Sequence, residues 1–386
     1  MPLKGLITEV SVRKGETTAE ILSVTNANGF VRSLDVFDKQ VFSNDSSNYK
    51  LVSFNDLAYN PSRINVGSVA LCQFPEGGAV SPMYVVVRYR ESLLPQFLHY
   101  FLKSNIGRQY IEHHCVGAVR FQLRFSDLER IELPLPPLLD QQRIVRILDE
   151  AVVLRHLHAQ ADQRVTALIP ALFDEMFGDP SANSRNWPIV DVSSLVERFQ
   201  AGRSIAPAGE ETATGKYRIL KISAVTWGRF APEESKPVPD TIAPAPEHFV
   251  RAGDMLFSRA NTTELVGATV LVETTPDNLL LPDKLWRFVW KKPEAIEPRF
   301  ALALFQHPAI RLELGNRATG TGGSMKNLSM GKVLSMKIPL PPFKLQRTFA
   351  GRVAEIRDLE AAQTANRQSL DKLFQSLLHR ALQGEL

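Results

Sequence analysis

Two copies of one proline-rich segment constrain what this chain of 386 residues can fold into. LPLPPLLDQQRIVRILDE covers residues 133–150 and IPLPPFKLQRTFAGRVAE covers residues 338–355, so the second copy begins 205 residues after the first. Proline fixes φ, lacks an N–H donor and restricts the residue before it, so neither Pro-Leu-Pro-Pro run can be helical. Each copy therefore predicts the end of one folded module and the start of a helix.

The similarity continues upstream of the proline runs. At a shift of 203 residues, Pro95 and Phe97 align with Pro298 and Phe300. Each half is thus predicted to contain a β-rich module, a helix, a polar glycine-containing loop, a proline-rich turn and one long helix. A shift near 205 would place residue 1 opposite residue 206, so we expect the first half to lack a counterpart for residues 186–204. Either the first module begins differently or it borrows this element from elsewhere in the fold.

The two long helices show the apolar spacing of a coiled coil. Apolar residues alternate by three and four positions over 144–172 and 349–377, with polar residues midway. Each seam has 28 steps and is about 42 Å long at roughly 1.5 Å per residue. Antiparallel packing in full register would place Ile144 opposite Leu377 and His158 opposite Gln363; alternatively, each helix packs separately on its own module. The helix–helix interface residues that we predict are Ile144, Leu154, His158, Leu168, Phe349, Ile356, Gln363 and Leu373. Pro170 should kink or end the first helix near Ile169.

Composition is that of an ordinary soluble globular chain. It is 44% hydrophobic and 22% charged, with no apolar run of 18 residues and no signal peptide, so we expect a cytoplasmic protein without a membrane contact. Cys72 and Cys115 are too few for a disulfide framework. A net charge of +4 permits contact with a polyanion, but only the distribution of charge can decide this.

The sequence shows no catalytic constellation, and we expect no metal and no cofactor bound by the chain. ATGTGGSMK (318–326) lacks the spacing of a phosphate-binding loop. NPSR (60–63) departs from the N-P-P-aromatic motif of amino-methyltransferases. His113, His114 and Cys115 are adjacent, and adjacent side chains rarely converge on one metal.

The whole pattern resembles the specificity subunit of type I restriction-modification enzymes. The resemblance rests on the repeated proline–glutamine–helix segment and on the helix ends LFDEMFGDP and LFQSLLHRALQGEL, and it covers essentially the whole chain. Two departures are the short N-terminus and Leu345, which stands where the first copy has Asp140. The resemblance implies an α+β fold of two mixed α/β target-recognition domains, separated by two long helices packed as an antiparallel coiled coil, with a pseudo-two-fold repeat. The implied domains are 1–137, 138–178 (central spacer), 179–342 and 343–386 (C-terminal spacer).

The resemblance also implies a non-catalytic subunit whose two domains each read one half of a bipartite site in double-stranded DNA. Its helices would set the spacing and dock two methyltransferase subunits, and restriction subunits through them. The partners would use S-adenosylmethionine, and ATP with Mg for restriction. One alternative is a specificity subunit whose partner fuses methylation and cleavage. Another is a coiled-coil adaptor that binds proteins, whose DNA affinity would be absent or insensitive to salt.

Base and phosphate contacts require guanidinium, ammonium, amide or hydroxyl groups in loops. In the first module we favour the NPSRIN loop and alternate positions of VRFQLRF, which would share a strand face; in the second we favour the loop after DMLFSR and TGTGGSMKN. The candidate DNA-binding residues are Asn60, Arg63, Asn65, Arg120, Gln122, Arg124, Arg259, Asn261, Thr262, Thr321, Ser324, Lys326 and Asn327. Trp286, Phe288 and Trp290 could stack on bases, but burial of this strand face against a helix is the favoured interpretation.

Overall fold

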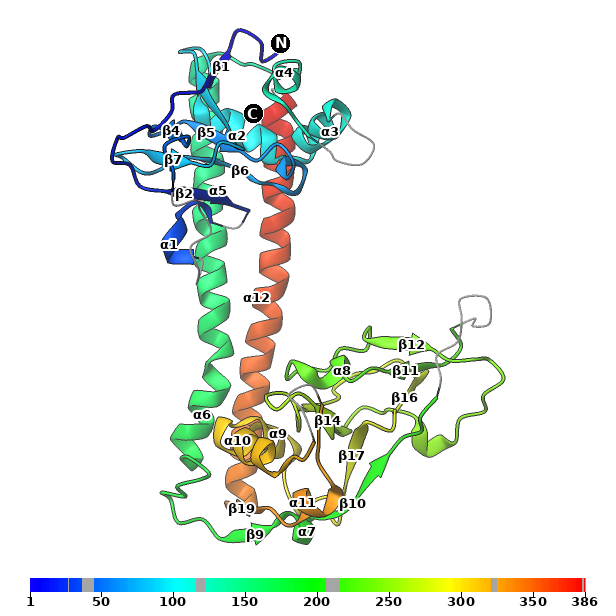
Figure 1. Cartoon of the computed structure of the whole chain (residues 1–386). Helices are drawn as coiled ribbons and strands as arrows, with labels where there is room; N and C mark the ends of the chain where they lie inside the picture. Colours follow the sequence, from blue (N-terminus) through cyan, green and yellow to red (C-terminus); the bar gives the residue numbers. More distant parts are fainter. Residues whose placement is uncertain are drawn as a thin grey trace. The chain divides into compact units, whose positions relative to one another are not determined.

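The chain forms two compact units in the computed structural model, which describes residues 1–26, 28–36, 45–115, 122–205, 215–320, 325–383 and 385. The first unit comprises Met1–Gln160 with Thr364–Leu386, and the second comprises Ala161–Gln363. Each unit therefore contains one mixed module together with parts of the long helices α5 (Leu138–Thr166) and α12 (Phe343–Gln383) (Figure 1). Among the described residues no helix is both long and apolar enough to cross a membrane.

The first unit is built on a four-stranded antiparallel sheet in the order β1-β8-β5-β6. Two helices cover one face of this sheet, and two small two-stranded sheets, the hairpin β2-β3 and the pair β4-β7, pack on the other. Its elements are β1 (Ile7–Val10), β2 (Leu22–Thr25), β3 (Gly29–Arg32), α1 (Ser33–Val36), β4 (Lys50–Val52), β5 (Leu57–Tyr59), η1 (Ile64–Val66), β6 (Val69–Leu71), β7 (Gly78–Val80), β8 (Val85–Tyr89), α2 (Pro95–Lys103), α3 (Asn105–His114) and α4 (Phe125–Leu128).

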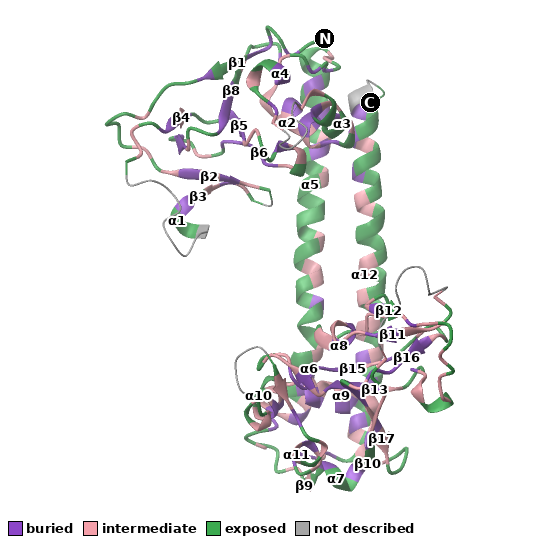
Figure 2. Ribbon diagram, turned by 45° about the vertical axis from the view of Figure 1, so that its right-hand side comes forward, coloured by how far each residue is buried: buried purple, intermediate pink, exposed green. Residues whose placement is uncertain are grey.

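Burial on both faces explains why these strands have continuous apolar sequences. Leu57 and Tyr59 face the helices, whereas Ala58 between them belongs to the core on the hairpin side. Val86 and its neighbours in β8 alternate in the same way, as expected for a side-chain period of two. Figure 2 colours these strands mainly as buried. Because both faces of the sheet are covered, a ligand can reach only the loops that connect its strands.

The second unit repeats this sheet order with β10-β17-β13-β15. Helices α9 and α10 occupy the places of α2 and α3. Its elements are α6 (Leu168–Phe177), β9 (Ile189–Asp191), α7 (Val192–Leu195), β10 (Val196–Ala201), β11 (Arg218–Leu220), α8 (Ser223–Thr226), β12 (Ser235–Pro237), η2 (Pro246–His248), β13 (Met255–Ser258), β14 (Ala260–Asn261), β15 (Thr269–Leu271), β16 (Leu279–Leu280), β17 (Leu285–Trp290), α9 (Pro298–Gln306), α10 (Pro308–Arg317), β18 (Lys326–Asn327), α11 (Met330–Leu334) and β19 (Lys337–Pro339).

One ion pair recurs at the same place in both sheets. In the first unit the Nη2 atom of Arg88, on β8, lies 2.8 Å from Oδ2 of Asp56, just before β5. In the second unit Nη2 of Arg287, on β17, lies 2.9 Å from Oδ2 of Asp254, just before β13. Each aspartate also accepts the backbone N–H three residues earlier, at 2.8 Å and 2.7 Å, which fixes the turn that leads into the strand. The two modules are thus related in detail as well as in topology.

A buried glutamine explains the repeated proline–glutamine sequence. The amide oxygen of Gln141 accepts the N–H of Leu94, the N-cap of α2, and its amide nitrogen donates to the carbonyls of Ser92 and Pro136, all at 2.9 Å. Gln346 makes the same link in the second unit: its oxygen accepts the N–H of Glu297 and its nitrogen donates to the Pro341 carbonyl. Both side chains are essentially inaccessible, so each secures the first turn of a long helix to the helix pair of its module.

The expectation that the first half lacks a counterpart of residues 186–204 is wrong. Strand β1 pairs with β8 as β10 pairs with β17, and Pro2 forms a bridge with Glu132 much as β9 pairs with β19. The first residues of the chain therefore correspond to the segment around β9 and β10. Equivalent residues in the two segments are about 189 positions apart in the sequence. The sliding alignment missed them because the loops between the shared strands differ in length.

The seam of the long helices lies about one residue away from the predicted positions at several points. Ile144 and Phe349 are buried, each in the core of its own unit, whereas Leu154, Leu168 and Leu373 are 49%, 42% and 54% exposed. In the first unit the apolar contact is made by Leu148, Phe374, Leu378 and Ala381. Adjacent apolar pairs such as Leu373–Phe374 offer two seams with the same heptad spacing, so the pattern alone could not choose between them. His158 and Gln363 belong to different units, and their pairing stays a prediction, as does the role of the half-buried Ile356.

Helix α5 ends at Thr166, slightly before the predicted break, and α6 begins at Leu168 with Pro170 in its first turn. The proline ring would clash with the carbonyl of Thr166, four residues earlier, which explains a break at this point rather than at Ile169.

The interpretation of the β17 aromatics as core residues is confirmed. Trp286 and Phe288 are buried, Trp290 packs partly buried against the same core, and Phe288 meets Phe305 of α9 with ring centroids 5.2 Å apart.

Candidate nucleic-acid interface

The loop between β5 and β6 carries three of the candidate residues and is shaped by local hydrogen bonds. The side-chain oxygen of Asn60 accepts the N–H of Ser62 at 3.0 Å, and its carbonyl accepts the N–H of Arg63 at 3.0 Å. The short helix η1 follows and ends at Gly67, whose φ of 94° is a left-handed conformation that favours glycine. Residues 60–68 therefore form a defined turn at the edge of the sheet.

A second candidate segment lies against this loop. Leu123 donates its backbone N–H to the Pro61 carbonyl at 3.1 Å, and the Gln122 amide donates to the Ser62 hydroxyl at 3.3 Å. The structure thus brings together segments 60–65 and 122–124, which are far apart in sequence. We call these two segments the first loop pair.

The expected strand face over residues 120–124 is wrong for its described part. Gln122 forms only an isolated bridge, and Arg124 precedes α4, which begins at Phe125. Arg120 lies outside the described residues.

The side chains of the first loop pair keep their charged groups available. Arg63 and Arg124 are exposed, and neither forms a salt bridge with a carboxylate among the residues that the structure describes. Asn65 is half-buried, and the amide nitrogen of Asn60 lies 3.8 Å from Sδ of Met83, a residue that is 60% exposed. Guanidinium and amide groups of this kind can donate to base edges or to phosphate oxygens.

In the second unit the corresponding segments pair directly as strands. β14 and β18 place Asn261 opposite Lys326 and Ala260 opposite Asn327, and the N–H of Leu328 donates to the Arg259 carbonyl at 2.8 Å. Segments 259–262 and 326–327 are therefore brought together, and we call them the second loop pair. Thr321 and Ser324 lie outside the described residues.

Most side chains of the second loop pair are engaged in local contacts. Nε of Arg259 donates to the Asp283 carbonyl at 3.0 Å, and Nζ of Lys326 donates to the Gly320 carbonyl at 3.1 Å. Oδ1 of Asn261 accepts the N–H of Thr262 at 2.9 Å. The pKa of the Glu264 carboxyl is lowered, first by its own backbone N–H and then by the Thr262 hydroxyl. These residues hold their own loop in shape, as Asn60 and Gln122 also do in the first loop pair, so the difference between the two pairs lies in the exposed Arg63 and Arg124.

A further local repeat was missed in the sequence. INVGSVAL (64–71) and ELVGATVL (264–271) match at a shift of 200, which differs from the shifts of 203 and 205 found elsewhere. Both contain a glycine of positive φ, Gly67 at 94° and Gly267 at 81°. This short match around a glycine could have shown from the sequence that the two loops are equivalent.

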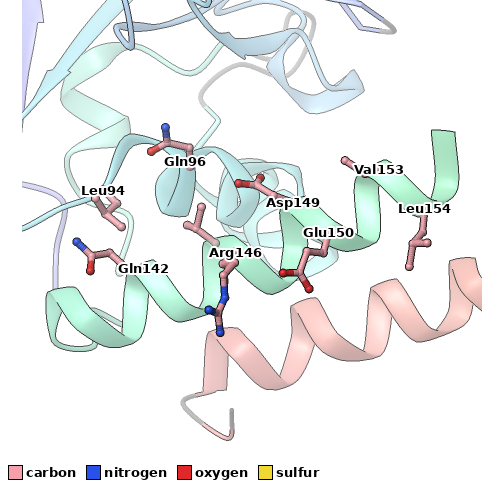
Figure 3. Close-up of a pocket in the computed structure, with 9 residues that line it drawn as sticks. Leu94, Gln96, Gln142, Arg146, Asp149, Glu150, Val153 and Leu154 are labelled. Atoms are coloured by element: carbon pink, nitrogen blue, oxygen red, sulfur yellow. The ribbon is translucent and has the colours of Figure 1, made fainter. Parts of the chain in front are cut away.

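A groove of about 710 Å³ runs along α5 and the start of α2 in the first unit (Figure 3). Its wall combines apolar and charged side chains, with Val153 and Leu154 beside Arg146 and Glu150. Val153, Leu154 and Leu157 are each about half exposed, at 57%, 49% and 53%. A contiguous apolar patch with a charged rim is typical of a protein-docking surface.

The chain is similar to several known proteins of one class. Residues 40–167 match the family model of the type I restriction modification DNA specificity domain. The chain is 26% identical to the type I restriction enzyme EcoKI specificity subunit of Escherichia coli K12, covering 78% of this chain and 68% of that one. It is 21% identical to the MjaVIII specificity subunit of Methanocaldococcus jannaschii, covering 87% and 80%.

A solved structure, described as the basis of complex assembly and conformational transition of the type I R-M system, has the same fold. Its TM-score is 0.65 at 17% identity, and the match covers 100% of this chain and 97% of that one. The chain is thus similar, over most of its length, to the specificity subunits of type I restriction enzymes.

Proposed function

We propose that this chain is the DNA-specificity subunit of a type I restriction-modification system and that each of its loop pairs reads one half of a bipartite site in duplex DNA. One observation carries the proposal. In both units the same two segments meet at the same place in the same sheet topology, and these are the segments rich in amide, guanidinium and ammonium groups. Groups of this chemistry discriminate bases through donors and acceptors in a groove.

Two independent modules suit a bipartite site because their contacting side chains differ. At the shift of 200 residues that relates the two loops, Asn60 aligns with Ala260 and Arg63 aligns with Thr263, so equivalent positions carry different side chains. A shared backbone arrangement with different side chains permits two different half-sites to be read by one fold. The sequence of each half-site depends on these side chains.

The long helices are proposed to pair as an antiparallel coiled coil that fixes the distance between the half-sites. Contacts within each unit support this. In the first unit α5 and α12 run in opposite directions (Figure 1), with Nε of Arg155 2.8 Å from Oδ1 of Asp371. In the second unit Phe177 of α6 meets Phe349 of α12 with ring centroids 5.3 Å apart. Inserting four residues, about one helical turn, into each helix should lengthen the unread gap of the DNA site.

The groove along α5 is proposed as part of the surface that docks a methyltransferase subunit. Its half-exposed Val153 and Leu154 supply apolar area, and the charged residues at its rim supply orientation. Two methyltransferase subunits would bind, using S-adenosylmethionine, and restriction subunits would join through them, using ATP with Mg.

Sequencing of methylated positions tests this function. The chain is expressed with the methyltransferase encoded beside it in a host that lacks adenine methylation. We expect methylated adenines in one bipartite motif with a fixed gap, and none when either chain is expressed alone. Methylation by this chain alone, or no motif from the pair, would contradict the proposal.

A further inference from the structure

Two cations lie close together beside the first loop pair. Lys103 is the last residue of α2, and Arg108 is in the first turns of α3, the helix that packs against η1. A Cβ built at Gly67 would lie 4.0 Å from Nη2 of Arg108, so the guanidinium sits directly beside the left-handed turn of the loop. Neither residue is among the base-reading candidates predicted from amide and loop chemistry, because both lie on helices.

The proximity of Lys103 to Arg108 is electrostatically unfavourable when no anion is bound between them. Burial, and then the neighbouring Arg108, lower the pKa of Lys103. Among the described residues neither cation forms a salt bridge with a carboxylate. Placing like charges together with partial burial costs free energy unless an opposite charge compensates.

A cavity of about 450 Å³ adjoins Lys103. His99 and Asp149 also line it, and the Asp149 carboxylate already accepts the Tyr100 hydroxyl at 2.6 Å. Nε2 of His99 is buried and has no hydrogen-bond partner among the described residues. Burial, and then Lys103, lower the pKa of His99 to about 4, so the imidazole is neutral at physiological pH and carries no charge of its own. The site therefore holds an unpartnered imidazole nitrogen beside two cations that form no salt bridge with a described carboxylate.

The second unit uses the equivalent positions differently. At a shift of 203, Lys103 aligns with Gln306 and Arg108 aligns with Arg311. The Gln306 amide donates to the carbonyls of Gly228 and Thr269, both at 2.9 Å, and Nη2 of Arg311 donates to the Glu264 carbonyl at 2.9 Å. These two side chains thus support local backbone, and only one of them is a cation.

We infer that Lys103 and Arg108 form a phosphate clamp that grips the DNA backbone next to the first loop pair, and that the second unit has no equivalent two-cation clamp. The inference rests on the proposed DNA-binding function and adds the phosphodiester contacts to it. Such contacts position the protein on the duplex without reading its sequence. The clamp would hold the first module in place while the side chains of its loop pair meet the bases.

The salt dependence of DNA binding tests the clamp. The variant K103Q/R108Q removes both charges, and Lys103→Gln introduces the residue type that the fold accepts at position 306. R13Q/K14Q is the matched control, since it removes two neighbouring charges from the segment between β1 and β2. Affinity of the complex with its methyltransferase is measured on a duplex carrying the methylated motif, from 50 to 200 mM salt.

Loss of two phosphate contacts should reduce the slope of log K against log salt by about 1.8. Over this fourfold range of salt, wild type should lose roughly 12-fold more affinity than K103Q/R108Q, while the control keeps the wild-type slope. The methylated motif should be unchanged in both variants, which also shows that they fold.

Two failures are distinguishable. If the wild-type complex shows no specific DNA binding, the proposed function fails and the clamp with it. If wild type binds specifically and K103Q/R108Q keeps the full salt slope, or alters the methylated motif, the clamp alone is refuted.

Discussion

The first and second loop pairs share a backbone frame and differ in what their side chains do. In the first, Arg63 and Arg124 are exposed and form no salt bridge with a described carboxylate. In the second, Arg259 and Lys326 donate to carbonyls of their own module. The shared backbone arrangement therefore determines where a ligand can contact each module. The side chains determine the affinity and the selectivity of that contact. Variants that change one member of an equivalent pair therefore test whether the two modules differ in this way.

The largest expected effect concerns the buried glutamines. Q141L should lower the free energy of unfolding of the first unit by about 4 kcal/mol, because three buried backbone groups lose their partner. Q346L removes two such bonds from the second unit and should cost about 3 kcal/mol. Chemical unfolding measures both, and Q142L, at an exposed position on the same helix, is the control. Equal stability of Q141L and Q142L would refute this role.

The repeated ion pair should show a smaller and unequal effect. The side chains of Arg287 and Asp254 are only 11% and 14% exposed, so R287L leaves a buried carboxylate without its cation and should cost about 3 kcal/mol. Arg88 is 51% exposed, so water can take the place of its guanidinium beside Asp56, although that carboxylate is only 4% exposed, and R88L should cost about 2 kcal/mol. Unfolding by denaturant tests the order; a larger loss in R88L would contradict it.

A pH effect should distinguish the two units. His99 has a pKa lowered to about 4, first by burial and then by Lys103, whereas Leu302 stands at the equivalent position. The unfolded chain takes up a proton below pH 6.5 that the folded unit refuses, so stability is full above pH 6.5 and falls as the pH approaches 4. From pH 7.5 to 5.0 this contributes a loss of about 2 kcal/mol.

The variant H99L isolates the histidine contribution. Its unfolding free energy should fall less than that of wild type over the same pH range. An identical fall in both proteins would show that other groups account for the pH dependence.

The smallest expected effect is on DNA affinity. R63A should weaken binding to the methylated motif by about 1–2 kcal/mol and relax selectivity in one half-site, because the exposed guanidinium can meet a base edge. R259A removes a contact to Asp283, so it should reduce stability more than selectivity. Binding titrations on matched and single-mismatch duplexes separate these outcomes. An equal loss of affinity on all duplexes would indicate that Arg63 contacts a phosphate rather than a base.

Much of the architecture was predictable because the repeated segments have strong local determinants. The proline runs, the glutamines and the helical spacing identified where each long helix begins. The choice of seam could not be predicted, since Leu373 and Phe374 compete for the same face and the outcome depends on packing against the rest of the unit. The place of β1 was missed because unequal loops disturbed the alignment.

The candidate site was predictable only at the level of segments. The polar loops were found from amide and guanidinium content, and the structure brings 60–65 together with 122–124. The engagement of Arg259 by Asp283 depends on a contact 24 residues away, which no local pattern reveals. The position of Arg108 against Gly67 likewise follows from the packing of α3 on η1.

Independent reading of one half-site by each loop pair is the basis of the proposed function. It is tested most directly by sequencing the methylated positions made by wild type and by the variant N60A/R63A with the same methyltransferase. We predict that the first-module variant changes or relaxes one half of the motif and leaves the other half and the gap unchanged. A change in both halves of the motif, or an unchanged motif at wild-type affinity, would contradict independent reading by the first loop pair.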